Sequence, residues 1–194
     1  MTDDLPGDRA DRPHWLQSLR KPVTGLFPVV LLILVRVVHW PAPGWSLRIG
    51  GALAIALGEA LRAWAAGHLV KLDQLTASGP FAHVRNPLYL GSALIGAGFC
   101  LLSGAWWSWP LLAGGLGLVY PVSVAGEERR LARRFGQDYL SYAAAVPRWL
   151  PRWRAHRGAS ARFRWRQVLA NDEHLWGGSI ALLALCFAIL HGPV

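Results

Sequence analysis

The sequence predicts an all-α integral membrane protein with five transmembrane helices and a cytoplasmic helical segment between the fourth and the fifth. Three observations lead to this fold class. Hydrophobic residues make up 53% of the 194 residues and charged residues only 16%, whereas roughly 25% of the residues of a typical globular domain are charged. Uncharged or nearly uncharged runs recur with about the 20-residue length that crosses a bilayer. The basic residues gather on one side of these runs.

The apolar runs give the five helices in chain order. The first covers residues 22–40, the second 45–70 and the last 175–194. The 41 residues 86–126 contain no Asp, Glu, Lys or Arg. A single helix of that length would extend about 60 Å, twice the thickness of the bilayer core. We therefore expect two helices there, with a turn near Ser103 and Gly104.

The distribution of positive charge predicts the orientation. The net charge is +9, and 17 of the 20 basic residues lie in the N-terminal segment, in the connection between the second and third helices, and in residues 127–166. Basic residues are enriched in cytoplasmic loops. We therefore expect a cytoplasmic N-terminus and an external C-terminus, in the inner membrane if the cell is bacterial. This distribution explains the positive charge without a nucleic-acid partner.

The polar region 127–166 has two parts. In the first, five residues recur at helical spacings of 4, 4, 3 and 4, which predicts an amphipathic helix with an interruption at Gly136. These residues are Leu131, Phe135, Tyr139, Tyr142 and Val146. The second part, 148–166, mixes seven arginines with aromatic residues. Such a mixture can bind nucleic acid, but beside membrane helices we favour a segment lying at anionic lipid headgroups.

Residues 78–91 form the most informative stretch. Gly79 and Pro80 are typical of a turn, Asn86 is a favourable N-cap, and Pro87 suits the first turn of the third helix. A helix N-terminus has free N–H groups and a positive dipole end, so it can hold an anionic group. The alternative is that these residues only begin a membrane helix, with Tyr89 as an interfacial anchor.

Acidic residues at two further places are candidates for chemistry. Adjacent helical residues point about 100° apart, so we expect only one of Glu127 and Glu128 to face a site; an ion pair of Glu127 with Arg130 is the structural alternative. Glu59 and Arg62 are ionisable residues inside the predicted second helix, where such residues are functional by default. They can pair with each other, or Arg62 can reach the headgroups.

An ordered set of motifs resembles one methyltransferase family. The run Gly79-Pro80-Phe81 followed by Arg85-Asn86-Pro87-Leu88-Tyr89-Leu90-Gly91 is similar to the Arg-His-Pro-x-Tyr-x-Gly motif of the isoprenylcysteine carboxyl methyltransferases and the related phospholipid methyltransferases. The downstream series from Glu127 to Pro151 follows the order found in that family. This resemblance implies binding of S-adenosylmethionine. The implied cofactor contacts are Asp73, Gln74, Leu75, Thr76, Phe81, Asn86, Pro87, Leu88, Tyr89 and Glu127.

Two positions depart from the family pattern. Asn86 stands where histidine is commonest, and Ser123 stands where eukaryotic carboxyl methyltransferases carry a substrate-binding arginine. We expect Arg62 to supply a cation in its place, with Glu59 and Arg85 as further candidate catalytic residues. The long polar region after the fourth helix is expected to lie over the cofactor as a lid. No metal site is expected.

The whole chain is expected to form one membrane methyltransferase domain. It consists of a cytoplasmic segment 1–21, a cofactor-binding region 72–152, a basic interfacial segment 153–174 and the last helix 175–194. The expected reaction is carboxyl O-methylation of a lipophilic acceptor, and phospholipid N-methylation is the alternative. An NADPH enzyme related to sterol reductases and a non-catalytic membrane protein are less favoured. The partners implied are membrane lipids and a lipophilic substrate, and the oligomeric state stays open.

Overall fold

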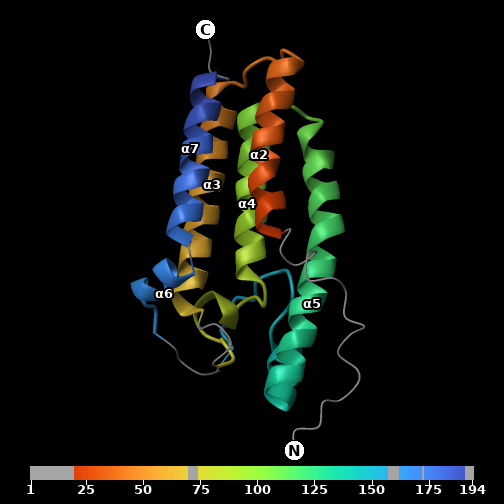
Figure 1. Ribbon diagram of the computed structural model, residues 1–194, viewed down its shortest axis with the longest axis vertical. Helices are drawn as coiled ribbons and strands as arrows, with labels where there is room; N and C mark the ends of the chain where they lie inside the picture. The colour runs from red at the N-terminus through yellow and green to blue at the C-terminus, as the bar shows by residue number, and fades with distance from the viewer. Residues whose placement is uncertain (1–19, 70–73, 157–161, 172, 191–194) are drawn as a thin grey trace, which may run out of the picture.

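The computed structural model describes residues 20–69, 74–156, 162–171 and 173–190, and these residues form helices joined by short connections (Figure 1). The described residues contain no β-strand, in agreement with the predicted all-α class. The elements, in chain order, are α2 (Arg20–Val37), α3 (Trp45–His68), the 3₁₀ helix η2 (Gly79–Ala82), α4 (Pro87–Ser103), α5 (Ser108–Ala145), α6 (Trp165–Ala170) and α7 (Glu173–Leu190).

Helices α2, α3, α4 and α7 run side by side along the long axis, and α5 lies next to them and extends past their lower ends (Figure 1). The short helix α6 and the turn η2 lie at the lower end of the bundle. The main core joins buried side chains of α2, α3, α4 and α7, which include Leu31, Ile55, Phe99 and Phe187. This core holds α3 and α4, whose lower ends contribute to the cavity described below.

The helix boundaries agree with several turn signals in the sequence. Helix α4 ends at Ser103, and Gly104 follows it with φ of 63°, so the predicted turn is confirmed. Helix α5 joins the predicted fourth helix and the amphipathic segment into one element. Its φ and ψ leave the helical region at Gly136, which is the predicted interruption. Helix α7 begins at Glu173, two residues before the expected start.

Three of the helices, α3, α5 and α7, are long and apolar enough to cross a membrane. The apolar parts of the other two, Leu26–Val37 in α2 and Pro87–Ser103 in α4, are shorter. Large apolar side chains stay exposed on the outside of the long helices, for example Leu57, Leu118 and Leu182. The membrane character of the chain is therefore supported by three helices, and five spans stay a prediction.

Candidate active site

A cavity of about 330 Å³ lies at the lower end of the bundle, between the first turn of α4 and the second half of α5. Small-molecule sites in proteins have volumes of about 300–1,000 Å³. Residues 74–76, η2 and the end of α3 complete the wall. The lining residues are Leu69, Gln74, Leu75, Thr76, Phe81, Arg85, Asn86, Pro87, Leu88, Tyr89, Glu127, Glu128, Arg130, Leu131, Phe135, Tyr139 and Tyr142.

Nine of the ten residues expected to contact the cofactor line this one cavity. They are Gln74, Leu75, Thr76, Phe81, Asn86, Pro87, Leu88, Tyr89 and Glu127. The tenth, Asp73, lies outside the described residues. The fold thus brings together three segments that are separated by up to about 50 residues in the chain. Their roles toward a cofactor stay predictions.

The turn η2 is held against α3 and α5 by two contacts. Gly79 has φ of 58°, and a Cβ atom there would lie 2.6 Å from Nδ1 of the His68 ring. Only glycine tolerates both this backbone conformation and this close approach. On the other side, the Tyr142 hydroxyl donates a hydrogen bond of 2.8 Å to the Phe81 carbonyl. The side chain of Phe81 therefore has a fixed place in the wall of the cavity.

The start of α4 differs from the sequence prediction in one respect. Pro87 occupies the first turn and Asn86 the N-cap position, as expected, but the Asn86 side chain makes no capping hydrogen bond. Its Nδ2 atom instead donates to the Arg148 carbonyl at 3.2 Å. The expected side-chain cap is wrong, because the amide group is turned toward a backbone acceptor from a distant segment. The first-turn residues Pro87, Leu88 and Tyr89 line the cavity.

Both carboxylates of the Glu127-Glu128 pair line the cavity. The expectation that only one reaches the site is wrong, because the cavity extends around the side of α5. Glu128 accepts a hydrogen bond of 3.0 Å from Arg148 Nε and lies 3.1 Å from Arg85 Nη1. The hydrogen bond to Glu128 raises the pKa of Arg148. Two guanidinium groups thus fix one carboxylate in the cavity wall.

The apolar face predicted for the second half of α5 packs as expected. Tyr139, Tyr142 and Val146 are buried against Ala77, and Leu131 and Phe135 pack at the edge of the same cluster. The contact joins α5 to the residues just before η2. The amphipathic prediction is confirmed, and its apolar face forms one side of the cavity.

Residues 146–156, which we call the strap, run from the end of α5 back along the loop before α4. The strap forms three backbone hydrogen bonds with this loop: Arg85 N to the Pro147 carbonyl (2.9 Å), Arg152 N to the His83 carbonyl (3.0 Å) and His156 N to the Ala82 carbonyl (2.9 Å). No residue of the strap lines the cavity. Residues 127–166 were expected to lie over the cofactor as a lid. The part of this region in α5 instead forms one wall of the cavity, and the strap is hydrogen bonded to the loop before α4 without lining the cavity.

Arg62 and Glu59 lie outside the lining of the cavity. Arg62 donates to both carboxylate oxygens of Glu173 on α7, at 2.8 to 3.1 Å, and to the hydroxyl of Ser92 on α4 at 2.6 Å. Arg62 thus pairs with Glu173 and not with Glu59, which was one of the two alternatives for it. Glu59 Oε1 is buried and has no hydrogen-bond partner among the described residues. Of the three candidate catalytic residues, only Arg85 lines the cavity.

Sequence reasoning did not single out Glu173, and it did not predict that the strap is hydrogen bonded to the loop at residues 82–85. An acidic residue immediately before an apolar helix was a signal for Glu173. Among the described residues, there is no group of three or more His, Cys, Asp or Glu residues that could hold a metal ion.

Comparison with known proteins supports the family resemblance. Residues 48–138 match the model of the phospholipid methyltransferase family. The chain is 31% identical over 141 residues to the cobalt-zinc-cadmium resistance protein CzcN of Cupriavidus metallidurans, which covers 72% of this chain and 63% of that protein. It is 27% identical over 112 residues to the nickel-cobalt-cadmium resistance protein NccN of Alcaligenes xylosoxydans xylosoxydans, covering 57% and 52%. The chain thus aligns with less than two thirds of each relative. No solved structure matches.

Proposed function

Because residues 48–138 carry the phospholipid methyltransferase family match, we propose that this chain is an integral membrane methyltransferase that uses S-adenosylmethionine on a lipophilic acceptor. The observation that supports this function is the single cavity that collects nine residues implied by the family motifs. We also propose that the cavity faces the cytoplasm, where S-adenosylmethionine is made. The described parts of the basic segment that follows α5, residues 146–156 and 162–166, lie at the same end of the bundle.

The lining residues fit the chemical groups of S-adenosylmethionine. Its sulfonium and ammonium groups are cations, for which the carboxylate of Glu127 and the aromatic faces of the wall are suitable partners. Its carboxylate suits the first turn of α4 or the guanidinium of Arg85. Apolar side chains such as Leu131 suit the adenine ring. The cavity volume is also in the range of small-molecule sites.

The proposed mechanism rests on positioning and on exclusion of water. When bound, S-adenosylmethionine supplies an electrophilic methyl group. Glu127 holds the positive cofactor in place, and the packed aromatic residues Tyr139 and Tyr142 keep water from that side of the cavity. A carboxylate acceptor needs no base, whereas an amine acceptor must first lose a proton.

Arg85 is our candidate for orienting the acceptor. It lines the cavity, and its Nε atom is buried without a hydrogen-bond partner among the described residues, while its Nη1 lies 3.1 Å from Glu128. Because this atom has no exposed surface, an acceptor carboxylate reaches it only if the Arg85 side chain moves on binding. Ser123 is buried one turn before Glu127 and does not line the cavity. This arrangement favours carboxyl O-methylation as the first candidate reaction.

Phospholipid N-methylation is the second candidate. The description of the matching family favours it, and two carboxylates in the cavity wall can hold an amine headgroup. The relatives carry names that refer to metal resistance. A non-catalytic membrane protein serving such resistance is a third candidate, and it predicts no methyl transfer.

We expect the purified chain to transfer a labelled methyl group from S-adenosylmethionine into the lipid fraction of membranes. A carboxyl methyl ester releases volatile methanol in mild base, whereas an N-methyl group is stable there. Base-stable label on phosphatidylethanolamine derivatives would reverse our order of the two reactions. Absence of transfer, together with absence of S-adenosylmethionine binding, would refute the methyltransferase proposal. Binding of NADPH instead would favour the reductase alternative.

We further propose that the strap and the start of α6 rest on anionic lipid headgroups. Trp153 is 99% exposed, Leu150 80% and Trp165 70%, and Arg154 lies beside Trp153 in the sequence. Exposed aromatic and basic side chains at one end of a membrane bundle are typical of an interfacial surface. Because the strap is hydrogen bonded to the loop at residues 82–85, lipid contact can stabilise the cavity wall.

This surface predicts a dependence of cofactor affinity on lipid charge. In nanodiscs containing phosphatidylglycerol we expect tighter S-adenosylmethionine binding than in phosphatidylcholine alone. Arg154→Gln should reduce the difference by on the order of fivefold, the effect of losing one basic residue at an anionic surface. High salt should reduce it as well. Equal affinities in the two kinds of nanodisc would contradict the proposal.

A further inference from the structure

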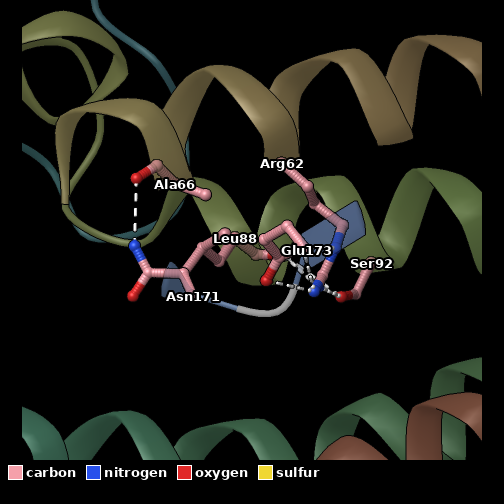
Figure 2. A network of polar contacts seen from close by, with 6 residues as sticks. All are labelled: Arg62, Ala66, Leu88, Ser92, Asn171 and Glu173. Carbon is pink, nitrogen blue, oxygen red and sulfur yellow. Dashed lines mark hydrogen bonds and ion pairs between the residues drawn. The ribbon is translucent and has the colours of Figure 1, made fainter. Parts of the chain in front are cut away.

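A buried polar network connects α3, α4 and the junction of α6 and α7 (Figure 2). At its centre, Arg62 on α3 donates to both carboxylate oxygens of Glu173 and to the Ser92 hydroxyl. Its guanidinium also lies over the Trp176 ring, 5.0 Å from the ring centroid. The exposed fractions of Arg62 and Glu173 are 7% and 8%. All donors of this guanidinium thus point at neighbouring helices and not into the cavity.

The same junction also covers the end of α3. Asn171, which is 5% exposed, donates from Nδ2 to the carbonyls of Ala66 (3.1 Å) and Leu69 (3.2 Å). The last carbonyls of a helix have no partner within it. Asn171 therefore caps α3 through a side chain located about 100 residues later in the chain. Figure 2 shows Asn171 and Glu173 on the same short stretch, facing α3.

Two backbone carbonyls connect this network to the cavity. Leu69 O accepts from Asn171, and Leu88 O accepts from Arg62 Nη1 at 3.4 Å and from Ser92 at 3.1 Å. Leu69 and Leu88 both line the cavity. The network therefore contacts two parts of the cavity wall through the backbone.

Stability alone is a weak reason for such a network. Burying an arginine and a carboxylate costs solvation, and well-packed apolar residues in place of a buried ion pair are often as stable or more so. A bidentate ion pair does, however, fix the relative position of the helices that carry its two residues. Here those helices are α3 and α7, and the hydrogen bond to Ser92 adds α4.

We propose that Arg62, Asn171 and Glu173 are positioning residues for the cofactor cavity. They hold the end of α3 and the first turn of α4 at the separation that binding of S-adenosylmethionine requires. The inference rests on the proposed function for its ligand. It changes the role of Arg62 from a candidate catalytic residue to one that acts through Leu88, and it gives α7, which does not line the cavity, a part in the site.

The test replaces the ion pair by apolar side chains of similar length, Arg62→Met with Glu173→Leu. This double variant removes both charges of the ion pair together, so neither Arg62 nor Glu173 is left as a buried charge without its partner. We expect its S-adenosylmethionine Kd to rise at least tenfold, with kcat less affected than KM. Arg62→Lys with Glu173 unchanged keeps the charge and should restore part of the affinity. Arg36→Met is the matched control, because Arg36 donates to the Leu190 carbonyl at the opposite end of the bundle.

A second measurement needs no ligand. In the ligand-free double variant, we expect amide hydrogen exchange to become at least tenfold faster in peptides covering residues 66–69 and 88–92, and to stay unchanged in Arg36→Met. Unchanged exchange there, or an unchanged Kd, would overturn the positioning role. A wild-type protein that binds no S-adenosylmethionine would instead refute the proposed function, while the exchange experiment would still decide whether the network orders the two segments.

Discussion

Glu127→Gln is expected to weaken S-adenosylmethionine binding about 10- to 100-fold, with the fold unchanged. Glu127 lines the cavity on α5, and we propose that its carboxylate faces the cationic cofactor. A hydrogen bond to a charged group contributes about 1.5–3 kcal/mol, which corresponds to this range of affinity. Glutamine keeps the size and one acceptor oxygen but loses the charge. Titration calorimetry on purified protein in detergent measures the change directly.

Two comparisons make this experiment specific. Asp138→Asn removes one carboxylate from an exposed position on the same helix, outside the cavity, and should leave the affinity unchanged. Glu128→Gln should weaken binding by another route, because it loosens Arg85 and Arg148. For that variant we expect a lower unfolding temperature along with the lower affinity. Equal affinities for wild type and Glu127→Gln would remove Glu127 from the proposed site.

Local signals in the sequence were sufficient to predict the elements that form the cavity. Pro87 marks the start of α4, Gly104 its end, and Gly136 the interruption of α5. Each signal works because the residue type itself restricts or permits a backbone conformation. The spacing of Tyr139, Tyr142 and Val146 predicted the buried face for the same local reason. The nine cavity residues, in contrast, were implied by the resemblance to the methyltransferase family and not by local signals.

Contacts between distant segments were not predictable in the same way. The partner of Arg62 is Glu173, 111 residues away, while the sequence suggested the neighbour Glu59 one turn before it. Likewise, Asn86 was expected to cap its own helix and instead donates to Arg148, 62 residues away. In the folded protein a side chain can bind any acceptor that lies near it in space. A single sequence shows only which acceptors lie near it along the chain.

Gly58→Val is expected to destabilise the fold by about 2–3 kcal/mol, as overpacking of a tightly packed interface does. Helices α3 and α4 approach closely at small residues, which is how membrane helices pack. A Cβ atom on Gly58 would lie 2.6 Å from the Gly91 carbonyl, and one on Gly98 would lie 2.7 Å from the Gly51 carbonyl. In both cases the obstacle is backbone, so the helices must move apart.

Gly117→Val is the matched control for this prediction. Gly117 is exposed on α5, and a Cβ atom there meets nothing within 4 Å, so the same substitution should leave stability nearly unchanged. Unfolding of both variants in mixed detergent micelles measures the difference. Equal stability would mean that α3 and α4 do not meet at Gly58. If Gly58→Val destabilises as expected, it should also lower S-adenosylmethionine affinity. Separating the two helices moves Leu88 at the start of α4 away from Leu69 at the end of α3. These are the two wall residues whose carbonyls bind Arg62 and Asn171.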